Sequence, residues 1–451
     1  MRVRRPMHEM LIKVSNRVSL HMPASQGNAP FDAPNLYGVE STELPVTDDL
    51  FKPTGAILEA ETLLANSAKA NASFLLSGGS TAGIHAMILY ACKRGNTLIL
   101  PRNSHLSALN ICAIAGIEPV FAELTELPGG YMMTTPDAFA KALDAHPQAK
   151  AILAISSDYY GLMSDLPAIA DIAHANGKLL LCDEAHGAYF NWRQDLQNAG
   201  QNGADLFVQS AHKTLPAVNA AAWLHASDRI DTEKLRSILR MVQTSSPSFA
   251  LMQAMDDARA WMDGHGQDAC TRLQSAVDSF LLDVTALGFT DDRGIMPFDR
   301  LRLVLRSPQG GEWLQKKLEK LGIDVEMWDA HRIVCILSLL DGERRLEILR
   351  DALKAIAAEN HDTVPVKSIL LKPDLWPERA MPLHEAAFAE YETLAPEDAV
   401  GRISASTVGI YPPGTAWLTA GDIVTEEIAG MILETPAHRL FGMSSGIRCV
   451  K

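Results

Sequence analysis

The sequence predicts an α/β fold, in which a large domain with a mostly parallel sheet precedes a smaller α+β C-terminal domain. Between residues 55 and 224, short apolar runs alternate with stretches of helical periodicity. The runs are almost continuously apolar, which is typical of strands that are buried on both faces of a parallel sheet and joined by helical crossovers. The predicted strands are Thr97–Leu100, Pro119–Ala122, Ala151–Ile155, Leu179–Cys182, Leu206–Val208 and Ala221–Leu224.

The same pattern divides the chain into three parts. Residues 1–50 are rich in Pro, Asn, Ser and Asp and show little periodicity, so we expect an N-terminal arm. Residues 51–287 form the large domain, which ends in a helical region. Strands and helices then alternate again, and a small α+β C-terminal domain is expected over residues 288–451, with predicted elements at Leu301–Leu305, Ile333–Leu337 and Leu346–Ala357.

The composition excludes several functional classes. The chain of 451 residues is 47% apolar and 21% charged, which is the profile of an ordinary globular protein. Its formal net charge of -14 repels nucleic acid and anionic membranes, so we expect neither as a partner. No run approaches the roughly 18 apolar residues of a membrane helix, and no signal peptide is evident. The six cysteines form no CxxC pair, so we expect reduced thiols in a soluble cytoplasmic protein, with no metal site.

Two charged residues lie directly beyond predicted strands, where ligands bind in sheets of this kind. Asp183 ends the run that begins at Leu179, and its carboxylate is able to pair with a protonated pyridine nitrogen, although an aspartate that only caps a turn gives the same pattern. Lys213 follows the run Asp205–Ser210 in a Ser-x-His-Lys context. A lone lysine there is usually a solvated loop residue, but a lysine whose pKa is lowered attacks an aldehyde to form an imine.

Two further motifs complete a candidate cofactor site. The small-residue turn Ser77–Gly83 precedes a helical stretch, and its backbone N–H groups with the Ser80 and Thr81 hydroxyls would hold a phosphate. Such turns are common in structural loops, so this motif supports a phosphate site only in combination with the motifs at Asp183, Lys213 and His105. His105 follows the strand Thr97–Leu100, where an imidazole would stack on a flat aromatic ring, whereas a histidine in isolation is more often structural.

The four motifs, in this order, resemble the Orn/Lys/Arg decarboxylase family of pyridoxal 5'-phosphate (PLP) enzymes. The resemblance covers most of the chain and is strongest from residue 77 to 224, through the segments GGSTAGIHAMI, PRNSHLSALN, DEAHGAYF and QSAHKTLPAV. Weaker matches are TELPVTDDL, QTSSPSFALM, ILSLLD and GRISASTVGIYPPG. The family adopts the aspartate-aminotransferase type of fold, so the resemblance implies a PLP-dependent transferase-like large domain.

The resemblance implies a role for each motif residue. Lys213 would carry PLP as a Schiff base, Asp183 would pair with the pyridine nitrogen, and His105 would stack on the ring as a third catalytic residue. His186 would lie beside the cofactor. The residues that would hold its phosphate, or surround it, are Ser80, Thr81, Ser210 and His212. Active sites in this fold usually form between subunits, so we expect a homodimer or a higher homo-oligomer in which Thr244–Ser248 reaches a neighbouring cofactor.

The chain departs from the family pattern where the substrate, or the loop that covers it, is expected. The family's N-terminal signature resembles HxPGHKxG, whereas residues 21–27 read HMPASQG, and the histidine and lysine of that loop are gone. Val218 and Asn219 replace a Thr-Gln pair, and Ser406 replaces an acidic residue. The sequence therefore supports PLP binding more strongly than it supports decarboxylation of lysine, ornithine or arginine.

The resemblance implies a PLP-dependent decarboxylase that acts on a basic or related amino acid through an external aldimine. Two alternatives stay open: another PLP reaction, such as transamination, elimination, retro-aldol cleavage or oxidation, and a non-catalytic relative that acts by subunit association. In an aminotransferase an arginine commonly holds the substrate carboxylate, and the candidates are Arg300, Arg302, Arg332 and Arg402. A basic substrate needs a carboxylate for its distal cation, and the candidates are Glu43, Asp48, Asp49 and Glu326.

Overall fold

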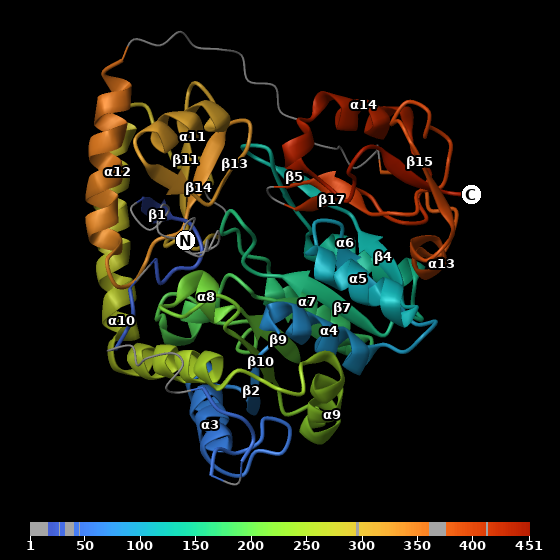
Figure 1. Ribbon diagram of the computed structural model, residues 1–451, viewed down its shortest axis with the longest axis horizontal. Helices are drawn as coiled ribbons and strands as arrows, with labels where there is room; N and C mark the ends of the chain where they lie inside the picture. The colour runs from blue at the N-terminus through green and yellow to red at the C-terminus, as the bar shows by residue number, and fades with distance from the viewer. Residues whose placement is uncertain are drawn as a thin grey trace, which may run out of the picture.

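A seven-stranded sheet organises the molecule, and two smaller units are attached to it (Figure 1). The computed structural model describes residues 17–26, 28–31, 40–44, 46–294, 297–359, 376–411 and 414–451. The order of the strands in the sheet is β2, β10, β9, β8, β7, β3, β4. Their bounds are β2 Ala72–Leu76, β3 Thr97–Pro101, β4 Glu118–Ala122, β7 Ala151–Ile155, β8 Leu179–Asp183, β9 Leu206–Gln209 and β10 Ala222–Ala226.

The sheet is mostly parallel, as the sequence predicts. Strands β9, β8, β7, β3 and β4 pair in parallel, whereas β10 runs antiparallel to both β9 and β2. Alternate residues of one strand enter different cores: Leu98 and Leu100 pack on one side of the sheet and Ile99 on the other. Because both faces are covered, the strands are mostly apolar before their carboxyl ends, and Ser73 of β2 and His225 of β10 are among the exceptions.

Helices cover both faces of this sheet and connect its strands. Their bounds are α3 Ala56–Ala68, α4 Gly79–Ala91, α5 Leu106–Ala115, α6 Pro136–Ala145, α7 Leu166–Ala175, α8 Ala211–Thr214, α9 Thr232–Val242 and α10 Phe249–Thr285, with the 3-10 helix η1 at Ala188–Trp192. The side chains of Thr135, Asp165 and Asp231 accept hydrogen bonds from first-turn N–H groups of α6, α7 and α9. Caps of this kind each stabilise a helix by about 1 kcal/mol, which fixes where the crossovers begin. A short hairpin, β5 Thr125–Leu127 and β6 Tyr131–Met133, projects from the end of β4.

The first smaller unit is a three-stranded sheet with two helices. Its elements are β11 Leu303–Arg306, α11 Gly311–Lys320, β12 Ile323–Val325, β13 Met327–Trp328, β14 Arg332–Cys335 and α12 Gly342–Ala357. The sheet order is β11, β14, β13, and all pairs are antiparallel. From the N-terminal arm, strand β1 (Val18–Leu20) pairs in parallel with β12, and α12 packs along α10. This pairing joins β1 to the first smaller unit through β12, in a two-stranded sheet separate from β11, β14 and β13.

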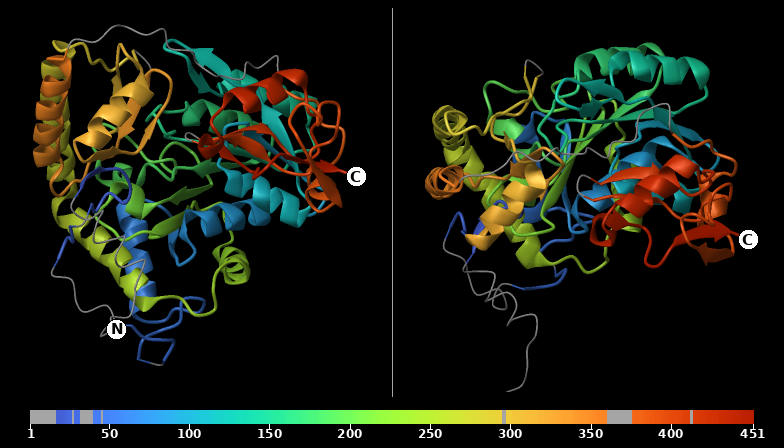
Figure 2. Two further views of the ribbon diagram at one scale, coloured as in Figure 1. Left: turned by 45° about the horizontal axis from the view of Figure 1, so that its top comes forward. Right: turned by 90° about the horizontal axis from the view of Figure 1, so that it is seen from above.

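Residues 376–451 form the second unit, which has a hydrophobic core of its own. Its elements are α13 Leu383–Ala387, β15 Tyr391–Leu394, β16 Val408–Ile410, β17 Thr415–Leu418, α14 Glu426–Glu434, the 3-10 helix η3 Ala437–Arg439, β18 Leu440–Phe441 and β19 Ile447–Val450. Helix α13 packs on α5 and β4, so this C-terminal unit contacts one edge of the large sheet and the helix beside it (Figure 2). Figure 1 shows the two smaller units on either side of β5. Domain boundaries near residues 50 and 287 remain our proposal.

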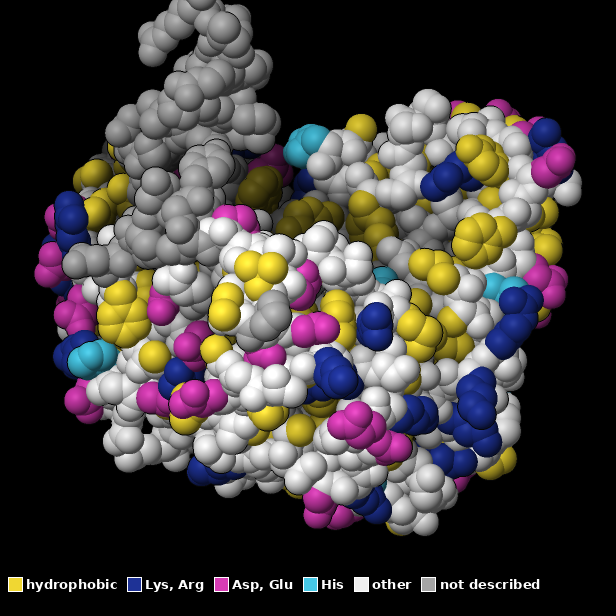
Figure 3. All heavy atoms as spheres, turned by 60° about the horizontal axis from the view of Figure 1, so that its bottom comes forward, with side chains coloured by type: hydrophobic (Ala, Val, Ile, Leu, Met, Phe, Trp, Pro, Cys, Tyr) yellow, Lys and Arg dark blue, Asp and Glu magenta, His cyan; other side chains and the backbone are white. Residues whose placement is uncertain are grey.

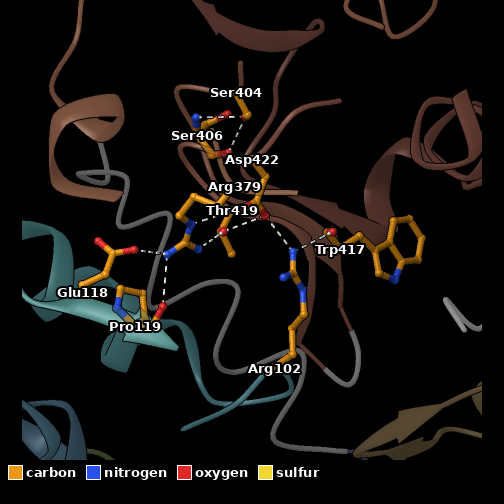
Figure 4. A network of polar contacts seen from close by, with 9 residues as sticks. All are labelled: Arg102, Glu118, Pro119, Arg379, Ser404, Ser406, Trp417, Thr419 and Asp422. Carbon is orange, nitrogen blue, oxygen red and sulfur yellow. Dashed lines mark hydrogen bonds and ion pairs between the residues drawn. The ribbon is translucent and has the colours of Figure 1, made fainter. Parts of the chain in front are cut away.

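A buried ion pair fastens the C-terminal unit to the end of β3 (Figure 4). Arg102, which directly follows β3, donates from Nη2 to Asp422 Oδ2 at 2.7 Å, and the two side chains are 6% and 1% exposed. Asp422 Oδ2 also accepts from the backbone N–H and the hydroxyl of Thr419, at 2.9 and 2.7 Å. Arg379 connects the same carboxylate to Glu118 at the start of β4. The contact therefore joins residues more than 300 positions apart in the chain.

Acidic, basic and hydrophobic side chains are interspersed on the face shown in Figure 3. Among the described residues, no helix is both long and apolar enough to cross a membrane.

We predict that Asp422→Ala lowers the free energy of unfolding by about 3–5 kcal/mol, because it leaves Arg102 buried without its carboxylate. Urea unfolding followed by tryptophan fluorescence measures the change. Glu392→Ala is the matched control, because Glu392 pairs with Arg402 at 2.8 Å while both side chains are more than one third exposed. Its expected cost is below about 1 kcal/mol. An equal loss in the free energy of unfolding for the two variants would contradict the claim that the Arg102–Asp422 pair is a buried stabilising contact.

Candidate active site

A cavity of about 990 Å³ opens at the carboxyl ends of the parallel strands. Three parts of the chain line it. The large sheet and the helices and loops that connect its strands contribute Ser80, Asn103, His105, Asp183, His186 and Lys213. The small unit adds Arg306, Trp313 and His331, and the C-terminal unit adds Trp376, Trp417 and Arg439. Four of the residues predicted from the sequence to bind a cofactor ring or form an imine, which are His105, Asp183, His186 and Lys213, therefore face one space.

Asp183 is the last residue of β8, the strand between β7 and β9. Its backbone lies opposite Ile155 and Val208 in the two neighbouring strands. The side chain is 8% exposed, and its Oδ1 atom accepts a hydrogen bond from Ala185 N at 3.1 Å. The strand pairing thus holds a nearly buried carboxylate at the cavity floor.

Lys213 lies on the short helix α8, which directly follows β9. Its Nζ atom is 3.2 Å from His186 Nε2 and 5.7 Å from the centre of the Tyr159 ring. Burial lowers the pKa of Lys213, while the negative charges of Asp183 and Glu326 act in the opposite direction. A larger fraction of this amine is therefore neutral and nucleophilic than in an exposed lysine.

His186 follows β8 and is 5% exposed. Its Nδ1 atom lies 2.9 Å from Arg302 Nη2, and its ring lies 4.6 Å from the Tyr159 ring, measured between centroids. Burial and the positive charges of Lys213 and Arg302 hold the pKa of His186 well below its usual value. The ring is consequently neutral at physiological pH.

His105 caps the start of α5 and presents its ring to the cavity. Its Nδ1 atom accepts from Ser107 N at 3.2 Å and lies 2.7 Å from the Ser107 hydroxyl. Enclosure by the cavity walls lowers the pKa of His105, while the charge of Asp183 opposes this effect. The capping bonds fix the orientation of a flat, neutral ring beside Asp183 and Lys213.

Two of the four predicted phosphate residues, Ser80 and Thr81, lie in the first turn of helix α4, whereas Ser210 and His212 lie at the start of α8. Gly79 has a φ of 69°, which favours glycine, and no side chain caps the first turn of the helix. Ser80 lines the cavity, and the buried Ser210 hydroxyl has no hydrogen-bond partner among the described residues. Thr81 is exposed, and Thr81, Ser210 and His212 do not line the cavity. His212 instead donates from Nδ1 to the Ala221 carbonyl at 2.9 Å.

Comparison with known proteins decides the family. A model of the Orn/Lys/Arg decarboxylase major domain matches residues 23–279, which is more than half of the chain. The chain belongs to the Orn/Lys/Arg decarboxylase family. The predicted family is thereby confirmed, and the chain is an enzyme of a PLP-dependent lyase family.

Two curated relatives match this chain over nearly their whole length. The uncharacterized protein YaaO of Bacillus subtilis is 32% identical over 94% of this chain and 92% of its own. An arginine decarboxylase of Halalkalibacterium halodurans is 29% identical, over 93% of this chain and 90% of its own. The crystal structure of the Francisella novicida lysine decarboxylase LdcF superposes with a TM-score of 0.76 at 15% identity, covering 89% of this chain and 73% of that chain. This structural likeness confirms the predicted fold class.

The donor groups of the cavity fit the cofactor of this decarboxylase family. PLP has an aldehyde, a pyridine nitrogen, a flat ring and a phosphate. Lys213 offers an amine with a lowered pKa, Asp183 a nearly buried carboxylate, and His105 a flat ring. The uncapped first turn of α4 offers backbone N–H donors for a phosphate, together with the Ser80 hydroxyl in the cavity wall.

Only one of the four arginine candidates lines the cavity. Arg300 pairs with Asp278 and Arg402 with Glu392, both outside the cavity, and Arg302 lies behind His186. Arg332 does line the cavity, but Asp292 at 3.2 Å and the Tyr131 ring at 4.0 Å already occupy its guanidinium. The structure therefore offers no unengaged arginine as a carboxylate clamp among the four.

Of the four carboxylates that were candidates for binding the distal cation of a basic substrate, only Glu326 is shown to act on Lys213. Asp48 accepts from Gly55 N and Ile57 N at 2.8 and 3.0 Å, so it caps α3, as an acidic residue before a helix commonly does. Asp49 accepts from Phe51 N at 2.8 Å, and Glu43 accepts from the Thr42 hydroxyl at 2.9 Å. Glu326, between β12 and β13, is the candidate close enough to raise the pKa of Lys213.

The altered N-terminal loop lies next to α8. Ala24 N donates to the His212 carbonyl at 2.8 Å, and Gln26 Nε2 donates to the Ile336 carbonyl at 2.8 Å. Gly27 lies outside the described residues. The altered loop therefore lies beside the helix that carries Lys213. The other two departures lie elsewhere: Val218 and Asn219 are exposed, and Ser406 is buried in the C-terminal unit.

Sequence reasoning missed the segment that follows β7. Asp158, Tyr159 and Tyr160 all line the cavity. The Asp158 Oδ1 atom accepts from Tyr160 N and Leu162 N at 2.9 and 2.8 Å, and burial raises the pKa of Asp158 to about 6. The segment SSDYYG begins directly after a predicted strand, so the rule that located Asp183 and Lys213 also pointed here.

Lys213→Ala is predicted to abolish retention of PLP. The variant lacks the amine that attaches the aldehyde, so gel filtration after incubation with PLP should leave no visible absorption band on the protein. Lys354→Ala, which changes an exposed lysine of α12, is the control and should retain the band. An unchanged band in Lys213→Ala would show that another amine attaches the cofactor.

Proposed function

We propose that this protein is a PLP-dependent decarboxylase of a basic amino acid. The observation that carries the proposal is the convergence of the Lys213 amine, the Asp183 carboxylate and the His105 ring on one cavity. The arginine and lysine decarboxylases among the relatives support the reaction class. PLP, when bound, acts as an electron sink for the bonds around the Cα atom of an amino acid.

Different residues of the chain would attach this cofactor, bind its ring and phosphate, and keep its pyridine nitrogen protonated. Lys213 would attach it through its neutral amine, and Asp183 would accept a hydrogen bond from the pyridine nitrogen and keep that nitrogen protonated. His105 would cover one face of the ring, while Ser80 and the first turn of α4 would hold the phosphate. His186 lies beside Lys213, where its neutral ring orients the amine.

The cavity walls suit the departure of carbon dioxide. Aromatic side chains contribute to the cavity walls, namely Tyr159, Tyr160, Trp313, Trp376 and Trp417. Such walls exclude water, and a carboxylate that is poorly solvated loses less solvation when it becomes carbon dioxide.

A cationic substrate is supported by the acidic groups around the same space. The acidic residues Glu126 and Asp158 line the cavity, and Glu326 influences Lys213 from the small unit. The lining residues Glu312 and Asp329 already pair with Lys316 and Arg332. Glu326 Oε2 accepts from Met22 N at 2.9 Å, which fixes the carboxylate through the N-terminal arm. We propose that Glu326 attracts the distal cation of the substrate.

We also propose a cytoplasmic homodimer. The six cysteines are all free and buried, as is usual in a reducing compartment. The segment Thr244–Ser248 carries exposed residues directly before α10, and the neighbouring Met241 is 72% exposed. A second subunit would cover Met241 and bring the segment towards its cofactor.

Release of carbon dioxide tests the proposed reaction. The enzyme loaded with PLP is incubated with carboxyl-labelled arginine, lysine and ornithine in turn, and the labelled gas and the amine product are quantified. We expect release from at least one of the three, in a one-to-one ratio with the amine. Formation of a keto acid without gas would replace decarboxylation by transamination.

Asp183→Asn is predicted to keep PLP but to lower kcat by about 100-fold or more, because an amide does not hold the pyridine nitrogen in its protonated form. Turnover is measured at saturating substrate, and the visible spectrum confirms that the variant is loaded. A loaded variant with the kcat of the wild type would rule out the proposed role of Asp183.

A further inference from the structure

A buried arginine lies directly behind the His186 ring. Arg302 is the residue directly before β11, and it is 2% exposed. Its Nη2 atom lies 2.9 Å from His186 Nδ1. Its Nε and Nη1 atoms have no hydrogen-bond partner in the part of the chain that the structure describes. Among the described residues, this guanidinium therefore makes its hydrogen bond to His186.

The chemistry of this contact determines which ring nitrogen carries the proton. A guanidinium stays charged and has only donors, so His186 Nδ1 has to accept the hydrogen bond. The ring is neutral, because burial and the charges of Lys213 and Arg302 hold the pKa of His186 well below its usual value. A neutral imidazole that accepts at Nδ1 carries its proton at Nε2.

The Nε2–H group in turn acts on Lys213. Lys213 Nζ lies 3.2 Å from His186 Nε2. An ammonium group has only donors and cannot accept this hydrogen bond, whereas a neutral amine has a lone pair that can. The positive charge of Arg302 adds to the effect of burial in lowering the pKa of Lys213. The hydrogen bond from His186 and the positive charge of Arg302 therefore both favour the neutral form of the Lys213 amine.

We propose that Arg302 is a positioning residue, which fixes His186 as the Nε2–H tautomer and thereby keeps the Lys213 amine neutral and ready to take up the cofactor aldehyde. The inference rests on the proposed role of Lys213 as the cofactor-binding amine. It replaces the clamp role considered from the sequence, because Arg302 does not line the cavity and His186 lies between it and Lys213.

Other charged or titratable groups face the same pair from the surrounding elements. They are Asp183 at the end of β8, His105 at the start of α5, His212 on α8, Tyr159 after β7 and Glu326 between β12 and β13. Substitution of Arg302 leaves all of them in place. A changed titration of Lys213 in an Arg302 variant is therefore attributable to Arg302 and the ring that it orients.

The amine is measured in the full-length chain freed of PLP. Trace acetylation over a range of pH, followed by peptide mass spectrometry, gives the neutral fraction of Lys213, with the exposed Lys354 as the internal reference. Arg302→Met removes the charge and the donor but keeps an unbranched side chain. We expect the acetylation midpoint of Lys213 to move to higher pH, with about a tenfold lower neutral fraction at pH 7.

A conservative variant separates positioning from a purely structural role. Arg302→Lys keeps both a positive charge and a donor, so it should restore the midpoint of the wild type. If Arg302→Met has the same Lys213 midpoint as the wild type, the proposal is overturned. A midpoint that moves equally in the Met and Lys variants also overturns it, because packing alone would then explain the effect.

The tautomer is measured in the wild type, which removes any dependence on how a variant folds. Long-range ¹H–¹⁵N spectra of the ring, assigned with His186→Asn, should show a protonated Nε2 and an unprotonated Nδ1. A protonated Nδ1 would contradict the proposal directly. Both readouts use enzyme without PLP, so they can succeed when no amino acid releases carbon dioxide, and they can fail while decarboxylation is observed.

Discussion

The parallel pairing of β8 with β9 is the constraint on which the candidate active site depends. Asp183 lies opposite Val208 in this pairing. Beyond the strands, Glu184 N donates to the Val208 carbonyl at 3.1 Å, and Ser210 N donates to the Ala185 carbonyl at 3.2 Å. These bonds bring the end of β8 and the start of α8 to one edge of the sheet. A shift of one residue would turn Asp183 to the opposite face and separate it from Lys213.

A buried polar network supports this edge from behind. Gln209 Nε2 donates to Glu184 Oε2 at 2.6 Å, and Gln209 Oε1 lies 3.1 Å from His225 Nε2. His225 in turn contacts the Ser73 hydroxyl at 2.7 Å, so the network crosses β9, β10 and β2. Burial raises the pKa of Glu184 well above its usual value. Burial therefore favours the protonated form of Glu184, whose side chain belongs to this network and does not line the cavity.

The sequence predicted the central sheet and the main chemical groups because both follow from local patterns. Apolar runs located the strands from Thr97 to Leu224, and polar residues just beyond the runs located His105, Asp183 and Lys213. The closure of the cavity depends instead on long-range packing. Nothing near Trp417 in the sequence indicates that the C-terminal unit turns back onto α5, because the ion pair that holds it joins residues 102 and 422. For the same reason, no local pattern distinguishes Arg302, which contacts His186, from the surface residue Arg300.

The central claim is that Lys213 attaches the cofactor, and reduction with borohydride tests it most directly. The enzyme is incubated with PLP, reduced, digested and analysed by peptide mass spectrometry, which locates the reduced cofactor on a single lysine. Our account predicts the label on the peptide that contains Lys213. A stoichiometric label on a different lysine, or none after loading with excess PLP, would contradict it.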